Sequence, residues 1–123
     1  MADQPATLAA SLDDLWHTIG ARARAADTRS SYTARLLAGG VDRVAQKLGE
    51  EATEVVIAGV QRDPSGVVTE SADLLYHLLV LWQATQVEPA AVAAELARRA
   101  QGSSGGRTSQ GRQAGPPDAG GDG

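Results

Sequence analysis

Residues 47–54 read KLGEEATE and residues 70–73 read ESAD, with fifteen residues between the two motifs. Each motif carries a pair of carboxylates three residues apart, namely Glu51 with Glu54 and Glu70 with Asp73. On a helix, side chains at this spacing project from the same face. The motifs therefore predict two helices that, packed side by side, turn four carboxylates into one pocket, with Glu50 at its rim.

A pocket of this kind needs a cation, because like charges at helical spacing destabilise a bare helix by a few tenths of a kcal/mol. Ligands that offer only oxygen suit Mg²⁺ or Mn²⁺, whereas Zn²⁺ prefers nitrogen and sulfur. The alternative is that the acidic residues coat two solvated helix faces, which is the usual meaning of a single pair. Spacing alone leaves both interpretations open. On the first, the metal ligands are Glu51, Glu54, Glu70 and Asp73.

Composition limits the fold and the partners. The chain has 123 residues, no Phe and no Cys, so its core must come from Leu, Val, Ile and Ala, which suits closely packed helices. The absence of Cys excludes disulfides and thiolate metal sites. A net charge of −4 argues against nucleic acid as a partner, although a polyphosphate bridged by metal or by local Arg and Lys is compatible with it. No basic leader or long apolar run is seen, which predicts a cytoplasmic protein without a membrane partner.

Apolar spacing and capping residues predict an all-α bundle of four to five helices. The first begins after an N-cap at Ser11, and the second spans residues 31–40 and is closed by Gly39 and Gly40. The third runs from an N-cap at Asp42 to about Ala58, and the fourth runs from Pro64 or Ser65 to Gln86 with Asp63 as its N-cap. The last begins at Glu88. The fourth is apolar on most sides, so a second subunit is its expected cover and a homodimer is predicted.

The folded domain is expected to span residues 1–101. From Gly102, the 22 remaining residues contain eight Gly and two Pro with almost no apolar side chains. Such a segment cannot bury enough surface to offset its ordering. Residues 102–123 are therefore predicted to form a disordered tail.

Several polar residues outside the acidic motifs are candidates for phosphate contact. Tyr32, Thr33 and Arg35 offer hydroxyls and a guanidinium close together, although half-burial or solvation is their more common state. Lys47 is the only lysine in the chain. Its ammonium could neutralise part of the carboxylate cluster or contact a phosphate.

Two further residues have open interpretations. Gly49 interrupts a predicted helix at a cost of about 1 kcal/mol relative to Ala, which indicates that a ligand or another helix approaches the backbone there. His77 follows Asp73 by four residues and could orient its carboxylate, although a satisfied interior histidine is more common.

The segments SYTARLLAGG, QKLGEEATEVVIA and ESADLLYHLLVLW together resemble the phosphoribosyl-ATP pyrophosphohydrolase family. The resemblance covers residues 8 to 100. This family belongs to the all-α nucleoside triphosphate pyrophosphatases of MazG type, whose EExxE and ExxD signature corresponds here to Glu50, Glu51, Glu54, Glu70 and Asp73.

The resemblance implies a homodimer of helical bundles that uses Mg²⁺ to hydrolyse 1-(5-phosphoribosyl)-ATP to 1-(5-phosphoribosyl)-AMP and pyrophosphate, the second step of L-histidine biosynthesis. Tyr32, Thr33, Arg35 and Lys47 would then contact phosphate or ribose. An unpaired carboxylate such as Glu50 could accept the proton of the attacking water.

Two alternatives lead to different experiments. A housekeeping (d)NTP pyrophosphatase of the same superfamily would use the same carboxylates on free nucleotides. A non-catalytic helical dimerisation module would show no metal dependence.

Overall fold

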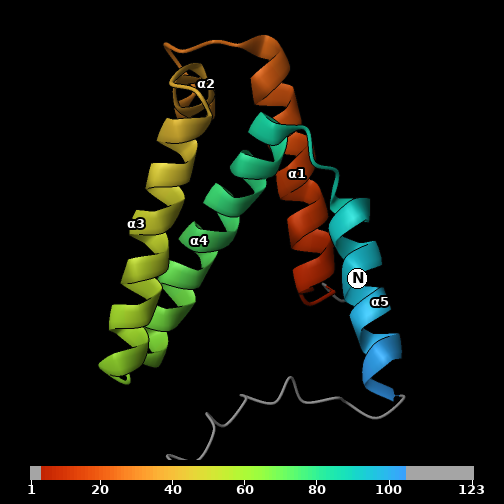
Figure 1. Ribbon diagram of the computed structural model, residues 1–123. Coiled ribbons are helices and arrows are strands. Elements are labelled where there is room, and N and C mark those ends of the chain that lie inside the picture. The colour runs from red at the N-terminus through yellow and green to blue at the C-terminus, as the bar shows by residue number, and fades with distance from the viewer. Residues whose placement is uncertain (1–3, 105–123) are drawn as a thin grey trace, which may run out of the picture. The chain divides into compact units, whose positions relative to one another are not determined.

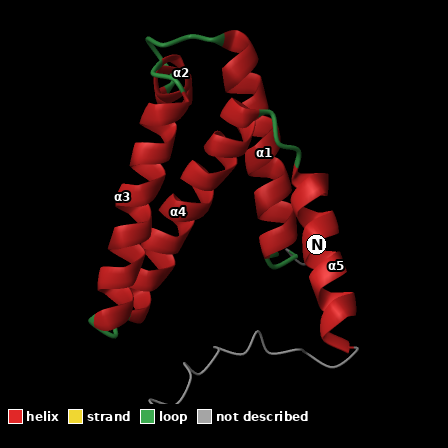
Figure 2. Ribbon diagram, in the orientation of Figure 1, coloured by secondary structure: helices red, strands yellow, loops and turns green. Residues whose placement is uncertain are grey.

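The computed structural model describes residues 4–104, and all regular structure within that range is helical (Figure 2). The helices are α1 (Leu8–Ala25), α2 (Tyr32–Ala38), α3 (Val41–Val60), α4 (Pro64–Thr85) and α5 (Pro89–Ser104). The predicted all-α fold class is confirmed.

The chain divides into two compact units, residues 1–89 and residues 90–123. The first contains α1 to α4. Within α5, hydrogen bonds from Arg98 and Arg99 lower the pKa of Glu95 to about 2. The predicted tail lies outside the described residues from position 105 onward, so it stays a prediction.

The first helix begins four residues earlier than predicted. Its N-cap is Thr7, whose Oγ1 accepts a hydrogen bond from the Ala10 amide at 3.1 Å. The prediction of an N-cap at Ser11 is wrong because Ala9 and Ala10 are strong helix formers that extend the helix back to the next available cap.

Two glycines connect α2 to α3, but only one of them has a positive φ. Gly39 remains right-handed with a φ of −75°, whereas Gly40 has a φ of 87° and precedes α3 directly. Glycine adopts this conformation without steric cost. The N-cap of α3 is Gly40, and Asp42 lies in the first turn of the helix. The prediction that Asp42 is the N-cap is therefore wrong.

Helices α3 and α4 form an antiparallel hairpin and pack against each other along their lengths (Figure 1). Asp63 caps α4 by accepting a hydrogen bond from the Gly66 amide at 3.1 Å, and Pro64 occupies the first helical turn. Both assignments confirm the prediction. This cap fixes where α4 begins, and so where Glu70 and Asp73 face α3.

The core of the first unit draws on all four of its helices and surrounds five buried side chains: Ile19, Leu36, Val44, Leu79 and Val80. Trp16 and Trp82 pack at its edge with ring centroids 6.5 Å apart. Towards the α3–α4 turn the hairpin extends away from α1, and Val60 and Val68 are 77% and 70% exposed there (Figure 1). None of the described helices combines the length and apolar character that a membrane span requires.

Candidate active site

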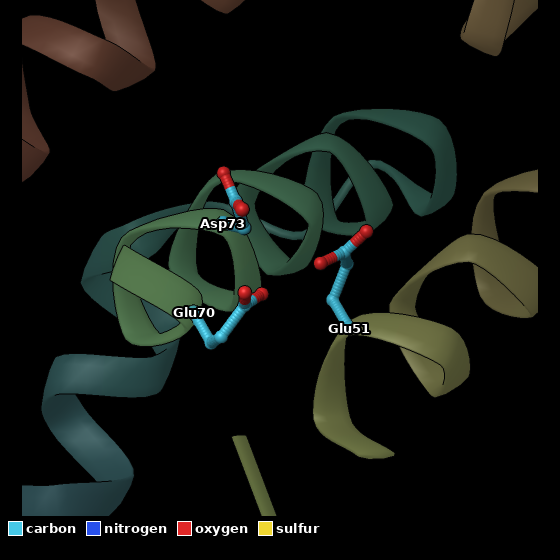
Figure 3. A group of neighbouring side chains, drawn as sticks. All are labelled: Glu51, Glu70 and Asp73. Atoms are coloured by element: carbon cyan, nitrogen blue, oxygen red, sulfur yellow. The ribbon is translucent and has the colours of Figure 1, made fainter. Parts of the chain in front are cut away.

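Three carboxylates converge midway along the α3–α4 hairpin. Glu51 extends from α3 towards Glu70 and Asp73 on α4, and one oxygen of each lies within 4.8 Å of the others (Figure 3). Glu51 and Glu70 are half-buried, and Asp73 is exposed. Helix α3 contributes one carboxylate from the first acidic motif, and α4 contributes two from the second. Together they form one site lined by oxygen atoms.

The cluster carries unbalanced negative charge. Partial burial raises the pKa of Glu70, and the charges of Asp73, Glu54 and Glu51 raise it further. Glu54 thus acts on the cluster electrostatically, although its oxygens are not among the three that converge. Within residues 4–104, no ion pair involves any of these four carboxylates. Several carboxylate oxygens that no cationic side chain neutralises form a set of ligands that fits a hard divalent metal ion.

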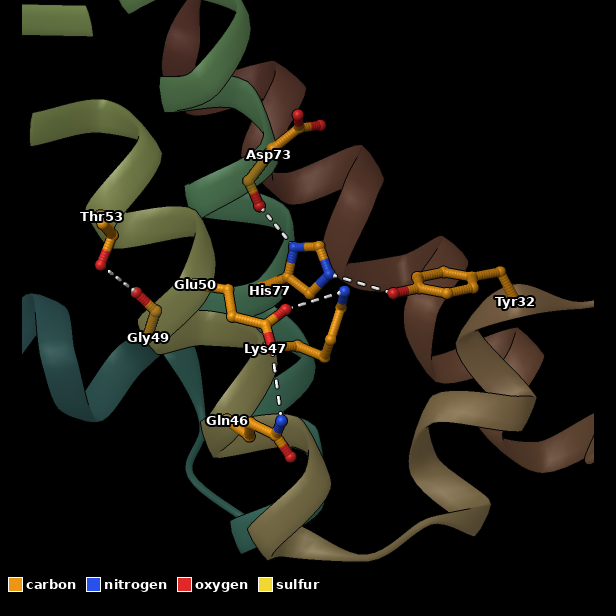
Figure 4. Close-up of polar contacts among 8 residues, drawn as sticks. All are labelled: Tyr32, Gln46, Lys47, Gly49, Glu50, Thr53, Asp73 and His77. Atoms are coloured by element: carbon orange, nitrogen blue, oxygen red, sulfur yellow. Dashed lines mark hydrogen bonds and ion pairs between the residues drawn. The ribbon is translucent and has the colours of Figure 1, made fainter. Parts of the chain in front are cut away.

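Glu50 lies beside this cluster but is engaged elsewhere. It accepts hydrogen bonds from Lys47 Nζ at 3.1 Å and from Gln46 Nε2 at 3.3 Å (Figure 4). The Lys47 hydrogen bond is the main reason why the pKa of Glu50 is lowered. The prediction that Glu50 is unpaired is therefore wrong, since residues three and four positions earlier on a helix can reach it.

Lys47 is paired with Glu50 within the acidic motif. Its hydrogen bond to Glu50 raises its pKa, the charge of Glu50 raises it further, and the charge of Arg43 lowers it. Arg43 therefore acts on the ammonium. Sequence reasoning missed Arg43, although its position four residues before Lys47 on α3 places both cations on the same face.

The other predicted substrate contacts differ in accessibility. Tyr32 is exposed, and its hydroxyl lies 3.4 Å from His77 Nε2. Thr33 is buried, and its hydroxyl is hydrogen-bonded to Tyr76. Arg35 is exposed and donates from Nη1 to the Thr28 carbonyl at 3.0 Å. The fold thus places Tyr32 beside His77, buries Thr33, and directs Arg35 to the connector between α1 and α2.

A chain with this fold and acidic site can be compared with known protein families. The family model for phosphoribosyl-ATP pyrophosphohydrolase matches residues 12–100. The chain belongs to this family.

Relatives named phosphoribosyl-ATP pyrophosphatase share much of the sequence. The protein from Parvibaculum lavamentivorans is 62% identical over 91 residues, which cover 74% of this chain and 83% of that protein. The one from Azospirillum brasilense is 53% identical over 97 residues, 79% of this chain and 86% of its own. The match to the pyrophosphohydrolase family includes every predicted site residue from Tyr32 to Asp73 and ends before the predicted tail.

Two further residues had open interpretations. At Gly49 no other part of the described chain lies within 4 Å of the position that a Cβ would occupy, so the helix-crossing alternative is wrong. The Gly49 carbonyl accepts a hydrogen bond from the Thr53 hydroxyl at 3.0 Å (Figure 4). His77 is buried and contacts the backbone carbonyl of Asp73 rather than its carboxylate, in line with the interior interpretation.

Proposed function

We propose that this chain hydrolyses 1-(5-phosphoribosyl)-ATP to 1-(5-phosphoribosyl)-AMP and pyrophosphate, as in the second step of L-histidine biosynthesis. Membership of the pyrophosphohydrolase family across residues 12–100 carries the proposal. The convergence of Glu51, Glu70 and Asp73 supports it, because a triphosphate substrate needs a cation to meet an acidic site.

The residues that would hold Mg²⁺, or Mn²⁺ in its place, are Glu51, Glu70 and Asp73, with Glu54 adjacent. These side chains offer only oxygen ligands, and within residues 4–104 none of them forms an ion pair with a cationic side chain. Both features fit such an ion. When bound, the metal would neutralise phosphate charge and make a water molecule more acidic.

The products define the bond that breaks. Water is added across the anhydride bond between the α- and β-phosphates, so that one phosphorus gains the water oxygen and pyrophosphate is released. A carboxylate must accept the proton of the water. Glu50, with its lowered pKa and its bond to Lys47, is a weaker acceptor than a carboxylate of the cluster. Its contribution to catalysis is to orient Lys47.

The cationic and hydroxyl groups would bind the rest of the substrate. Lys47, which forms an ion pair with Glu50, and the exposed Tyr32 would each contact a phosphate or a ribose hydroxyl. Arg35 would reach the phosphoribosyl phosphate with the donors that Thr28 does not occupy. Thr33, being buried, would support Tyr32 rather than touch the substrate.

We also propose that the active form is a cytoplasmic homodimer. Val56, Val60 and Val68 remain 63%, 77% and 70% exposed in the first unit. Contact with a second copy would remove this apolar surface from water.

The decisive assay compares kcat/KM for phosphoribosyl-ATP, ATP and dUTP in the presence of Mg²⁺. We expect phosphoribosyl-ATP to be preferred by at least about tenfold, because a charge-assisted contact to its additional phosphate contributes about 1.5 to 3 kcal/mol. Arg35→Ala should reduce this preference more than it reduces metal affinity.

The controls separate the alternatives. Asp73→Asn should abolish turnover, whereas Asp14→Asn, which removes a charge from the exposed surface of α1, should not. A preference for dUTP or ATP would favour the housekeeping pyrophosphatase. Absence of any Mg²⁺-dependent hydrolysis would favour the dimerisation module.

A further inference from the structure

The junction between α2 and α4 concentrates the buried polar side chains of the described chain. Among residues 4–104, the buried polar side chains are Ser31, Thr33 and His77. Ser31 caps α2 by accepting a hydrogen bond from the Ala34 amide at 3.1 Å, and the other two connect α2 to α4. Buried polar groups are costly unless satisfied, and a satisfied network fixes geometry.

The contacts of His77 determine which nitrogen carries its proton. Its Nδ1 lies 2.8 Å from the Asp73 carbonyl oxygen, which can only accept a hydrogen bond, so Nδ1 is the donor (Figure 4). In the neutral imidazole Nε2 then has a lone pair. The Tyr32 hydroxyl, 3.4 Å from Nε2, must therefore donate to it.

Aromatic packing supports this orientation. The rings of Tyr76 and His77 meet edge to face, with centroids 5.0 Å apart and an angle of 87°. The Tyr32 ring stacks on Tyr76 at 6.3 Å and 29°. Because Thr33 is hydrogen-bonded to Tyr76, α2 is attached to α4 at two neighbouring points.

The second histidine of the chain provides a comparison within the same molecule. His17 Nδ1 lies 2.7 Å from the Asp13 carbonyl, in the same arrangement four residues apart, but His17 is exposed. The backbone contact is therefore ordinary for a helical histidine. Burial and the Tyr32 hydroxyl at the other nitrogen distinguish His77.

We propose that His77 is a positioning residue, which accepts a hydrogen bond from the Tyr32 hydroxyl and holds Tyr32 against the turn of α4 that carries Asp73. Its side chain links a predicted substrate contact to the backbone of a predicted metal ligand. The Asp73 carboxylate is not involved, so substrate binding should depend on His77 more than metal binding does. The effect on turnover rests on the proposed function, whereas the hydrogen bond does not.

Two amide substitutions separate the two nitrogens. In His77→Gln the longer side chain can place its amide oxygen near the Nε2 position and accept from Tyr32, whereas in His77→Asn the shorter one can donate to the Asp73 carbonyl but does not reach Tyr32. We expect His77→Asn to raise the KM for phosphoribosyl-ATP about tenfold, as loss of a hydrogen bond to a binding group would. The kcat and the Mg²⁺ concentration for half activation should change less than about twofold.

His77→Gln should restore most of the lost affinity, and in a Tyr32→Phe background His77→Asn should have little further effect on KM. Equal behaviour of the Gln and Asn variants, or an undiminished effect of His77→Asn in the Tyr32→Phe background, would overturn the proposal.

A second measurement is independent of turnover. The chain has two histidines, so ¹⁵N NMR resolves two imidazoles. At about pH 8, where neutral tautomers are compared, we expect His77 to carry its proton on Nδ1. Tyr32→Phe should shift the Nε2 resonance of His77 and leave that of His17 in place.

An Nε2-protonated His77, or a resonance insensitive to Tyr32→Phe, would refute the hydrogen bond. Failure of the wild-type protein to hydrolyse phosphoribosyl-ATP would instead refute the proposed function, and the NMR result would still decide the role of His77 towards Tyr32.

Discussion

Glu70 illustrates how single residues of this site differ from ordinary surface carboxylates. It is half-buried, and three other carboxylates act on it, so its pKa is raised. A raised folded-state pKa means that the folded protein holds the proton more tightly than the unfolded chain does. The stability that Glu70 contributes is therefore fully present below its unfolded pKa and is lost as pH rises through its folded pKa. At neutral pH the ionised side chain opposes folding of the metal-free protein.

Glu70→Gln should consequently raise the Tm of the metal-free protein at pH 7. The difference from wild type should shrink as pH falls through the raised pKa of Glu70 and should vanish below about 4.3, the ordinary pKa of Glu, because the wild-type side chain is then neutral in both states. Hydrolysis should fall by more than about 100-fold, since loss of an outer partner of a metal ligand already costs 10 to 100-fold.

Thermal unfolding from pH 3 to 8 without metal, together with a Mg²⁺ titration, measures both effects. Asp14→Asn is the matched control, because it removes a carboxylate from an exposed position on α1. A Glu70→Gln protein that is less stable than wild type at pH 7, or that retains near-normal turnover, would contradict this account.

At the same scale, the sequence predicted the three carboxylates that gather but also placed Glu54 among them, and it did not predict how each is engaged. Spacing of three residues placed Glu70 and Asp73 on one face, and the structure brings Glu51 to them. The sequence indicated that the Lys47 ammonium could neutralise part of the cluster, and the structure pairs it with Glu50. The contact between Tyr32 and His77 joins residues 45 positions apart, so no local pattern could have indicated it.

At the scale of helices, prediction succeeded where a capping residue has no competitor. Asp63 followed by Pro64 specified the start of α4, and the structure agrees. The start of α1 was misplaced because Thr7 and Ser11 both suit a cap and the alanines between them favour the longer helix. The helix crossing considered for Gly49 is wrong, because no other part of the described chain lies close to it.

The cap of α4 should matter for stability and for the site. Asp63→Ala removes the acceptor for the Gly66 amide and should destabilise the protein by about 0.5 to 2 kcal/mol, the usual range for loss of an N-cap. Because α4 carries Glu70 and Asp73, fraying of its first turn should also raise the Mg²⁺ concentration needed for half activation.

Urea unfolding and a Mg²⁺ activation curve test this expectation. Asp63→Asn is the control, since Asn caps helices about as well as Asp and should stay within about 0.5 kcal/mol of wild type. If Asp63→Asn destabilises as much as Asp63→Ala, the charge and not the cap accounts for the effect.

At the scale of the whole molecule, the apolar pattern predicted that a second subunit covers part of the chain, which stays a prediction. The core gathers Ile19, Leu36, Val44, Leu79 and Val80 at the α2 end of the hairpin. Towards the α3–α4 turn, Val56, Val60 and Val68 are exposed. The sequence could not specify which apolar positions meet a second subunit, because periodicity distinguishes an apolar face from a polar one but does not identify its partner.

Val60→Lys tests whether this exposed face joins two copies. Val60 lies at the C-terminal end of α3, where a cation is favourable for the helix, so folding should be preserved. We expect light scattering to give the wild-type protein twice the monomer mass of 12.6 kDa, and the variant the monomer mass at concentrations where the wild type is dimeric. Gln61→Lys adds the same charge to the neighbouring exposed residue and removes no apolar side chain, so it should remain dimeric. A monomeric wild type would refute the homodimer, and a dimeric Val60→Lys would place the interface elsewhere on the chain.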